Sequence, residues 1–408
     1  MAECKFCGNK LGNSFLDLGM QPLCNNNVKF SCVDQSEKFY PLDVFVCSKC
    51  FLVQLKHEIF PEEIFSEYTY LSSYSSTWLE HARKYCENII SDLNLAKDSF
   101  VVELASNDGY LLQNFKNYEI SCVGVEPAEN VSKIAQNKGI NTINAFFNSG
   151  LAINIINDYK KADLIIANNV FAHVPDINDF VLGIKELLSD TGVLTIEVPY
   201  LKNLINFNQF DTIYHEHIFY YSLSSINKIL MYHDLVIYDV EELNTHGGSL
   251  RVFAKHEKNS LIQINPKVME KITDEDKLGM NDFAYYNDFS NSVECLKFSL
   301  IKTILDIKEK GKKVIGYGAP GKGNTLLNYC GIKQDLVEFT VDKNPIKQNT
   351  FLPGSRIPVY DVTKIKDEQP DYIFILPWNL KEEIMNELKY VRKWDAKFII
   401  PIPKVEII

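Results

Sequence analysis

The sequence predicts an α/β protein with two doubly wound, Rossmann-like parallel sheets behind a small cysteine-rich N-terminal module. Six of the ten cysteines lie within the first 80 residues, among many turn-forming residues. Residues from about 85 to 255 alternate short apolar runs with helical stretches, and residues 311–408 show the same alternation. Apolar runs of strand length that alternate with helical segments are typical of parallel sheets covered by helices.

The size and charge of the chain bound its organisation. A chain of 408 residues is expected to hold two or three domains. The net charge of −11 argues against general binding to nucleic acids or anionic membranes. The expected blocks are an N-terminal module (1–80), a central domain (81–258), a helical connector (259–310) and a C-terminal α/β domain (311–408).

The composition also predicts a cytoplasmic protein. The first ten residues, MAECKFCGNK, lack the apolar run of a signal peptide, and no stretch approaches the roughly 20 apolar residues of a membrane helix. In a reducing compartment the cysteines are expected to stay reduced, to bind metal or to be buried. The sequence leaves the oligomeric state open, a monomer included.

The strands are expected where β-branched and aromatic residues gather in short runs. The first of these runs reads FVVEL and the last reads KFIIP. The expected strands are 100–104, 121–125, 163–167 and 192–198 in the central domain, and 313–317, 337–341, 371–376 and 397–401 in the C-terminal domain.

Two Cys-x-x-Cys pairs, Cys4/Cys7 and Cys47/Cys50, predict a zinc site. Each pair fits a tight turn whose two thiolates face one ion, and four thiolates give the closed tetrahedral site of structural zinc. Redox-active or free thiols are the alternative. The 39-residue interval is long for a zinc ribbon, so the insert is expected to fold back over a neighbouring domain. We interpret Cys24 and Cys32 as ordinary residues of that insert.

A cofactor site is expected at the carboxyl ends of the first three central strands. An acid ends the first strand, a short loop with a glycine and a helix follow, and a second acid stands about 20 residues on, where it suits ribose hydroxyls. The full G-x-G-x-x-G pattern is missing, and a cofactor-free α/β domain is the alternative. The candidate cofactor residues are Glu103, Ala105, Ser106, Asn107, Gly109, Glu126, Pro127, Asn168 and Asn169.

A second glycine loop, KVIGYGAPGKG at 313–323, follows a strand and precedes a helix. It is closer to a dinucleotide fingerprint than the first loop, and Asp342 after the next strand would suit NAD. Pro320 and Lys322 within the loop suit a phosphate contact, so a nucleotide-sugar diphosphate is the simpler fit if the central domain holds the cofactor. A turn that only packs the helix on the sheet is the third interpretation.

The tract Tyr-His-Glu-His-Ile-Phe-Tyr-Tyr at 214–221 is the expected centre of the chemistry, because it concentrates side chains that exchange protons near neutral pH. If this segment were a strand, the side chains of Glu216 and His217 would point to opposite faces. The two side chains can line one pocket only if the segment is a turn or an irregular loop. A catalytic metal at His215 and His217 lacks an evident third ligand. The aromatic residues 219–221 are expected to pack in the core.

The order of these motifs looks like the sugar C-methyltransferases that act on nucleotide-linked 4-keto-deoxyhexoses. The paired cysteines, ELASNDG at 103–109, YHEH at 214–217, HGGSLR at 246–251 and the C-terminal GYGAPGKG occur together across the whole chain. The resemblance implies S-adenosylmethionine as methyl donor, methylation at C3 of the keto sugar, and a C-terminal domain that helps to hold the nucleotide sugar, with thymidine diphosphate favoured.

The resemblance also implies the catalytic residues. The family's Tyr-x-Glu-His set falls on Tyr214, Glu216 and His217, and a further tyrosine corresponds to Tyr68 or Tyr70. His173 matches another active-site histidine, although a helix-capping or core histidine is an equal alternative. The Gly-Gly of 246–251 suggests a close backbone approach, or a bare β-turn. The candidate substrate residues are His246, Gly247, Arg251, Gly318, Pro320, Lys322, Asp342 and Lys343.

The chemistry of a carbon nucleophile agrees with this assignment. A base beside C3 removes a proton made labile by the neighbouring ketone, and the resulting enolate attacks the methyl group. His217 is the expected base, because an ordinary imidazole titrates near pH 6.5. Glu216 is expected to orient the imidazole or contact a sugar hydroxyl, and the tyrosines to stabilise the oxyanion. An NAD-linked sugar dehydrogenase or isomerase, an O- or N-methyltransferase and a non-catalytic zinc-anchored binding protein are the competing functions.

Overall fold

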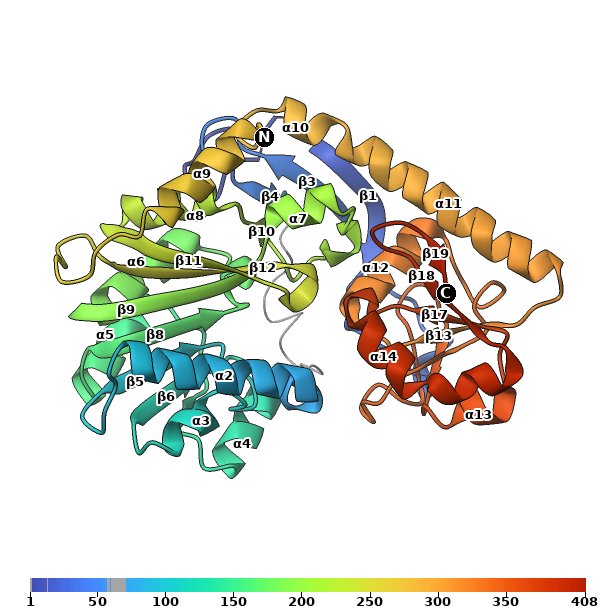
Figure 1. Cartoon of the computed structure of the whole chain (residues 1–408), viewed down its shortest axis with the longest axis horizontal. Helices are drawn as coiled ribbons and strands as arrows, with labels where there is room; N and C mark the ends of the chain where they lie inside the picture. Colours follow the sequence, from blue (N-terminus) through green and yellow to red (C-terminus); the bar gives the residue numbers. More distant parts are fainter. Residues whose placement is uncertain (1, 13, 57–58, 60–70) are drawn as a thin grey trace.

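Three sheets make up the computed structural model, which describes residues 2–12, 14–56, 59 and 71–408 (Figure 1). The central-domain sheet and the C-terminal sheet lie at opposite ends of the molecule, and the N-terminal sheet lies across the top between them (Figure 1). The α/β class predicted from the sequence is confirmed. Within the described residues, no helix is long and apolar enough to cross a membrane.

The N-terminal sheet is antiparallel and takes its last strand from the YHEH tract. Its order is β1 (Ser14–Pro22), β3 (Phe39–Val46), β4 (Val53–Leu55) and β10 (Phe219–Tyr220). Phe219 pairs with Gln54 and Tyr220 with Val53. The cysteine-rich module and the proposed catalytic tract therefore share one hydrogen-bond ladder.

The central sheet has the order β11-β12-β9-β8-β5-β6-β7. Strands β7, β6, β5, β8 and β9 run parallel, and β12 runs antiparallel to both of its neighbours. The strands are β5 (Phe100–Leu104), β6 (Ser121–Val125), β7 (Thr142–Ile143), β8 (Ala162–Asn168), β9 (Leu188–Pro199), β11 (Leu235–Leu243) and β12 (Ser249–His256). All four strands predicted here are confirmed.

Helices cover both faces of the central sheet because its parallel strands are apolar on both sides. The helices α2 (Ser76–Asp92), α3 (Leu112–Lys116) and α4 (Glu129–Asn137) share one hydrophobic cluster on one face. The helices α5 (Ser149–Asp158), α6 (Ile177–Leu187) and α8 (Leu223–Tyr232) share another on the opposite face. The turn η3 (Phe171–His173) follows β8, and α7 (Leu201–Asn206) and η4 (Phe210–Thr212) precede the tract.

The C-terminal sheet has the order β19-β18-β17-β13-β14-β16-β15-β2. Its parallel centre is β18 (Lys397–Ile400), β17 (Tyr372–Ile375), β13 (Val314–Tyr317), β14 (Thr340–Val341) and β16 (Pro358–Tyr360), and β19 (Glu406–Ile407) and β15 (Thr350–Phe351) run antiparallel at its edges. The helices of this part are α12 (Gly321–Cys330), α13 (Lys364–Glu368) and α14 (Lys381–Glu387), with the turn η6 (Trp378–Leu380). The predicted strand at 337–341 is shorter than expected, since only its last two residues pair.

The last strand of that sheet, β2 (Val28–Lys29), comes from the insert between the two cysteine pairs. Arg356 donates to Glu37 at 2.7 Å and to the carbonyls of Val33 and Gln35, and Phe30 packs against Phe351 with ring centroids 4.6 Å apart. The insert does fold back over another domain, as the long interval predicts, and it reaches the C-terminal one.

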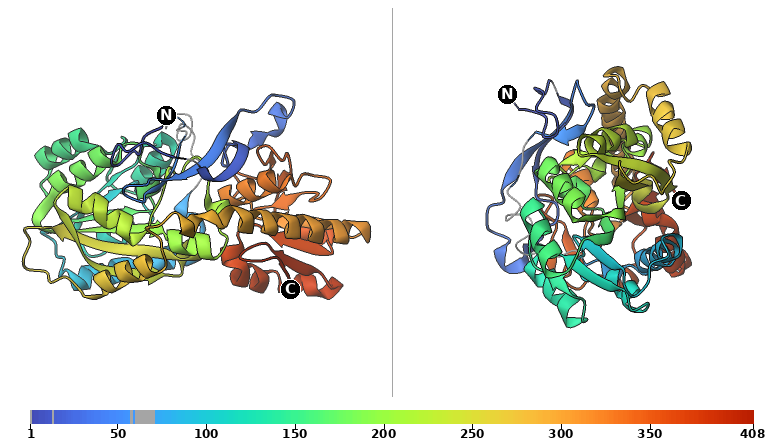
Figure 2. Two further views of the ribbon diagram at one scale, coloured as in Figure 1. Left: turned by 90° about the horizontal axis from the view of Figure 1, so that it is seen from above. Right: turned by 90° about the vertical axis from the view of Figure 1, so that its left-hand side faces the viewer.

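The connector consists of α9 (Lys267–Lys277), α10 (Ala284–Asn287) and α11 (Phe289–Glu309), and α11 runs along one side of the molecule (Figures 1 and 2). The buried carboxylate of Glu275 on α9 accepts hydrogen bonds from the backbone N–H groups of Leu223 and Ser224 and from the hydroxyl of Tyr200. Because the first amides of a helix lack partners within it, Glu275 caps α8.

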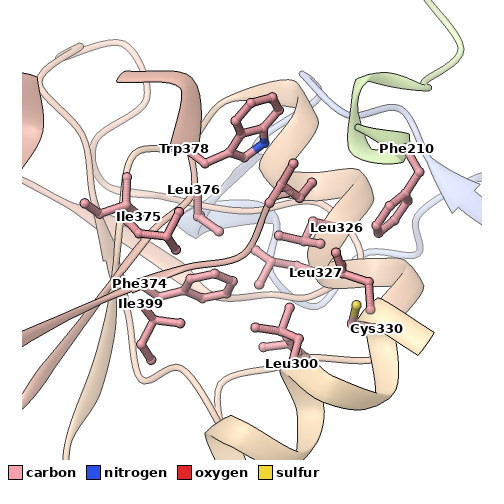
Figure 3. Close-up of a cluster of buried hydrophobic side chains, with 14 of the residues drawn as sticks. Phe210, Leu300, Leu326, Leu327, Cys330, Phe374, Ile375, Leu376, Trp378 and Ile399 are labelled. Carbon is pink, nitrogen blue, oxygen red and sulfur yellow. The ribbon is translucent and has the colours of Figure 1, made fainter. Parts of the chain in front are cut away.

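One hydrophobic core joins the N-terminal sheet, the segment before the YHEH tract, α11 and the C-terminal sheet. It contains Leu16 of β1, Phe210 of η4, Leu300 of α11 and Leu326 of α12, together with the strands of the C-terminal sheet. Phe210 and Leu300 both approach α12 in the cluster drawn in Figure 3. The segment that precedes the YHEH tract is therefore fixed where the sheets meet.

Candidate active site and zinc centre

The four paired cysteines form one cluster. The Sγ atoms of Cys4 and Cys50 are 3.6 Å apart, those of Cys7 and Cys47 are 3.6 Å apart, and all four lie within 4.8 Å of one another. Ligands at about 2.3 Å from a tetrahedral zinc ion stand about 3.8 Å apart, so the donor set and its spacing fit Zn²⁺. Four protein ligands close the coordination sphere, which makes the site structural.

The zinc cluster is connected to the active-site tract through Gln54. Its Nε2 lies 3.2 Å from Cys4 Sγ, and its backbone pairs with Phe219 in the ladder of β4 and β10. An N–H group directed at a thiolate stabilises the charged ligand and orients it. Gln54 therefore joins the metal centre to the strand that follows the tract.

The predicted cofactor residues gather at the carboxyl ends of β5, β6 and β8, on either side of the point where the strand order reverses. Both oxygens of Glu126 accept backbone hydrogen bonds, from Asn107 and Ala128, each at 2.9 Å. Positive φ angles at Ala105, Asn107 and Gly109 turn the loop sharply. A Cβ at Gly109 would stand 2.8 Å from Ile140, so this turn requires a glycine.

Several buried polar atoms of this edge have no hydrogen-bond partner in the described part of the chain. They are Glu103 Oε2, Ser106 Oγ, Asn168 Oδ1 and Asn169 Nδ2. Buried polar atoms are nearly always bonded, so a polar ligand is the natural partner for this set. Burial raises the pKa of Glu103 well above its usual range and that of Glu126 to about 7, and a cationic, hydroxyl-bearing ligand would compensate both.

The YHEH tract is a turn. The backbone N–H of His217 donates to the carbonyl of Tyr214 at 2.9 Å, and the strand begins only at Phe219. The side chains of Glu216 and His217 are therefore not forced onto opposite faces, as they would be in a strand. This meets the condition for the two residues to line one pocket. Next to the turn, the N–H of Ile218 donates to the carbonyl of Ala172 at 2.7 Å, which holds the turn against η3 and the end of β8.

The imidazole of His217 is held in one tautomer. Its Nδ1 lies 3.1 Å from the carbonyl oxygen of Thr212, and because a carbonyl only accepts, Nδ1 carries the proton. When this ring is neutral, its lone pair is on Nε2. The ring of Tyr214 packs at 4.1 Å and that of His173 at 4.8 Å between centroids. Burial lowers the pKa of His173 to about 4, so this second ring is neutral near pH 7.

Glu216 extends toward the insert of the N-terminal module. Its Oε1 accepts a hydrogen bond from Asn25 Nδ2 at 2.6 Å and lies 3.6 Å from the thiol of Cys24. The structure therefore places Cys24, which we interpret from the sequence as an ordinary residue of the insert, beside Glu216. No local pattern signalled these two residues, since they stand about 190 positions before Glu216 in the chain. The neighbouring His215 lies 3.3 Å from the carbonyl of Pro41 instead.

The C-terminal glycine loop adjoins the tract. The hydroxyl of Thr325 on α12 donates to the carbonyl of Ile213 at 3.0 Å. The ammonium group of the half-buried Lys322 lies 2.5 Å from Asn379 Oδ1 and 4.6 Å from the centroid of the Trp378 ring, and loss of hydration lowers its pKa to about 8. The indole N–H of Trp378 in turn donates to the carboxylate of Asp211 at 2.7 Å. Asp211 directly precedes Thr212, whose carbonyl oxygen contacts His217.

The other candidate substrate residues of this loop have protein partners. Asp342 accepts the backbone N–H of Ala319 at 2.7 Å, Lys343 pairs with Glu387 at 2.6 Å, and Pro320 stands at the N-cap of α12. Gly318 has a φ of 90°, and a Cβ there would stand 2.6 Å from Pro377. Their role toward a substrate stays a prediction.

The HGGSLR segment divides between a turn and a buried ion pair. Gly247 lies in η5 (Thr245–Gly247), where an added Cβ would stand 2.8 Å from Trp378. Arg251 donates to Glu197 at 2.7 Å inside the central sheet, with its guanidinium over Tyr85. The side chain of His246 and both Tyr68 and Tyr70 lie outside the described part of the structure.

Three family models match the chain. They describe a zinc binding domain over residues 4–65, a methyltransferase domain over residues 78–240 and a C-methyltransferase C-terminal domain over residues 244–403. The chain is also 34% identical over 406 residues to the C-methyltransferase NovU of Streptomyces niveus, covering 100% of this chain and 96% of NovU.

Solved structures of methyltransferases match less than half of the chain. An S-adenosylmethionine-dependent methyltransferase from Clostridium acetobutylicum ATCC 824 is 14% identical over 44% of this chain and 92% of its own, with a TM-score of 0.35. The magnesium protoporphyrin IX methyltransferase of Synechocystis PCC 6803 with bound S-adenosylmethionine is 15% identical over 43% of this chain and 78% of its own, with a TM-score of 0.34. Both predicted cofactors, S-adenosylmethionine and structural zinc, are confirmed by the family models and the four-cysteine cluster.

Replacing one zinc ligand tests the metal centre. Cys47→Ser is expected to lower the zinc content well below one ion per chain and to lower the unfolding temperature, because structural zinc contributes folding free energy directly. Cys295→Ser, at an exposed position on α11, is the matched control and should retain both. Atomic absorption and calorimetry measure the two quantities. A metal-free preparation with unchanged stability would contradict the assignment.

The buried neutral ring of His173 predicts an acid-dependent loss of stability. The unfolded chain protonates this histidine near pH 6.5 and the folded chain only near pH 4, so folding loses free energy as the pH falls between these values. At pH 5 this residue accounts for about 2 kcal/mol. His173→Gln should reduce the drop in unfolding free energy between pH 7.5 and pH 5 by that amount in urea titrations. The same drop in both proteins would show that the ring is not held neutral.

Proposed function

The chain belongs to the S-adenosylmethionine-dependent C-methyltransferase family, and from this premise we propose that it methylates C3 of a nucleotide-linked 4-keto-deoxy sugar. The observation that carries the proposal is the tautomer of His217. An imidazole whose Nδ1–H is bonded to the Thr212 carbonyl offers Nε2 as a base, and its neighbour His173 follows the end of β8, where the cofactor residues stand.

The reaction follows from the acidity of a carbon next to a ketone. Nε2 of His217 takes the proton from C3, and the electron pair of that C–H bond moves into the enolate, whose charge lies largely on the C4 oxygen. S-adenosylmethionine supplies the electrophilic methyl group, so a C3–CH₃ bond forms as the CH₃–S bond breaks. A positioned base typically contributes about a hundred- to ten-thousand-fold to such a step.

The side chains around His217 complete the proposed site. The phenol of Tyr214, whose ring packs on the imidazole, and a tyrosine at position 68 or 70 donate hydrogen bonds to the developing oxyanion. Glu216 contacts a hydroxyl of the sugar. The neutral ring of His173 keeps the neighbourhood of the base free of a second positive charge near pH 7.

The nucleotide part of the substrate is proposed to bind at the C-terminal glycine loop. Helix α12 begins at Gly321, so its first backbone amides and the ammonium group of Lys322 can face a diphosphate. Gly318 and Pro320 directly precede this helix start in the chain, and Asp342, followed by Lys343, accepts the backbone N–H of Ala319 there. Thymidine diphosphate is the proposed nucleotide, and Thr325 on the same helix bonds to the backbone before Tyr214.

The substrate proposal is tested with a panel of thymidine, guanosine and cytidine diphosphate 4-keto-deoxyhexoses and ¹³C-methyl-labelled S-adenosylmethionine. Mass spectrometry is expected to show one added methyl group, and carbon NMR to place it on C3. Without the methyl donor, solvent deuterium should enter C3, because the base acts on the substrate alone. A methyl group on oxygen or nitrogen would overturn the proposal.

The base is tested with His217→Asn, whose side-chain amide can still donate to Thr212 but has no basic nitrogen. Turnover and deuterium exchange at C3 are expected to fall by about a hundred- to ten-thousand-fold, while binding of the methyl donor is retained. His256→Asn, far from the tract in β12, serves as the control. Exchange at the wild-type rate in the His217 variant would exclude this residue as the base.

A further inference from the structure

We propose that Asn25, with Cys24, is a positioning residue that holds the carboxylate of Glu216 for catalysis. The inference rests on the proposed function, because it assigns to Glu216 a contact with the sugar. It adds to that function two residues from the insert between the zinc-binding pairs. A residue of the N-terminal module then takes part in orienting the active site.

The contact itself is short and directional. Asn25 Nδ2 lies 2.6 Å from Glu216 Oε1, which is the separation of a charge-assisted hydrogen bond. Glu216 is buried, and Cys24 is 3% exposed. A carboxylate can only accept, so the amide nitrogen of Asn25 faces it. A buried carboxylate needs such donors, because an unpaired charge in a protein interior costs several kcal/mol.

The thiol of Cys24 supplies a second, weaker donor to the same oxygen, at 3.6 Å. Burial, and then the charge of Glu216, raise the pKa of Cys24 well above its usual range, so the sulfur keeps its proton and donates. Both donors contact the same oxygen, Oε1, and both come from adjacent residues of the insert. The insert therefore constrains this side of the carboxylate.

The insert is itself held rigidly at this point. Asn324 of α12 donates to the carbonyl of Cys24, and the Cβ that any other residue would add at Gly321 would stand 2.9 Å from the Cys24 sulfur. A few residues on, Asn27 donates to Thr350 at 2.9 Å and β2 joins the C-terminal sheet. Asn25 thus rests on the same helix whose start is proposed to bind the diphosphate.

A double-mutant cycle separates positioning from support of the fold. Asn25→Ala is expected to lower kcat for methyl transfer about 10- to 100-fold, the range for loss of a hydrogen bond to a charged group, with a smaller change in KM. In a Glu216→Ala background the same change should cost less than about threefold, because its target is gone. Equal losses in both backgrounds, or no loss in either, would overturn the proposal.

Asn27→Ala is the matched control, since it removes a hydrogen bond from the same insert without touching Glu216. It should leave kcat near the wild-type value. Asn25→Asp, which has the same shape, guards against a misfolded alanine variant. It replaces the donor amide with a second carboxyl group, so its activity is expected to fall at least as far as that of Asn25→Ala. Wild-type activity in Asn25→Asp would contradict the role of the Asn25 amide as a donor to Glu216.

The double-mutant cycle and the substrate test can be contradicted by different results. Methyl transfer to oxygen or nitrogen would refute the C3 assignment, while the coupling between Asn25 and Glu216 would still be measured on that product. Correct C3 methylation with additive losses would refute the positioning role alone. Cys24→Ser keeps a donor and should retain activity better than Cys24→Ala; the reverse order would exclude a role for the thiol.

Discussion

The backbone pairing of β4 with β10 is the contact on which the arrangement of the active site depends. It ties the end of the YHEH tract to the zinc module, and Gln54 on the same strand reaches the cysteine cluster. At the other end of the tract, η4 lies against α12, with Phe210 in the shared core. A turn fixed at both ends can hold His217 in one tautomer, where a free loop would sample several.

Much of this could be predicted from the sequence, because the signals are local. The spacing of the cysteine pairs specifies four thiolates, and an apolar strand ending in Glu103 or Asn168 places that residue at a known edge of a parallel sheet. The contact of Asn25 with Glu216 left no such signal. It joins residues about 190 positions apart, and β2 has only two residues, too few to show a period.

Buried or partly buried charges recur within the central sheet and where other elements meet it or the C-terminal domain. Glu275 caps α8 from the connector, Arg251 pairs with Glu197 within the central sheet, and Lys322 lies near Asp211 at the C-terminal boundary. Each such group loses hydration on folding, and attraction to a partner offsets that loss only when the geometry is right. Apolar contacts tolerate sliding of one surface over another, whereas these pairs do not. These charged contacts therefore restrict how the elements around the YHEH tract can shift relative to one another.

The pairing of β2 with β15 has a consequence for the order in which the protein becomes competent. Residues 28 and 29 leave the ribosome long before their partners at 350 and 351 are made. Domains generally fold as they emerge, so the insert waits without its strand partner while the central sheet forms. Strand β2, a few residues after the donors to Glu216, can pair only once residues 350 and 351 have been made. A nascent chain that stops before them already contains the methyl-donor edge of the central sheet but lacks the pairing that fixes the insert beside Glu216.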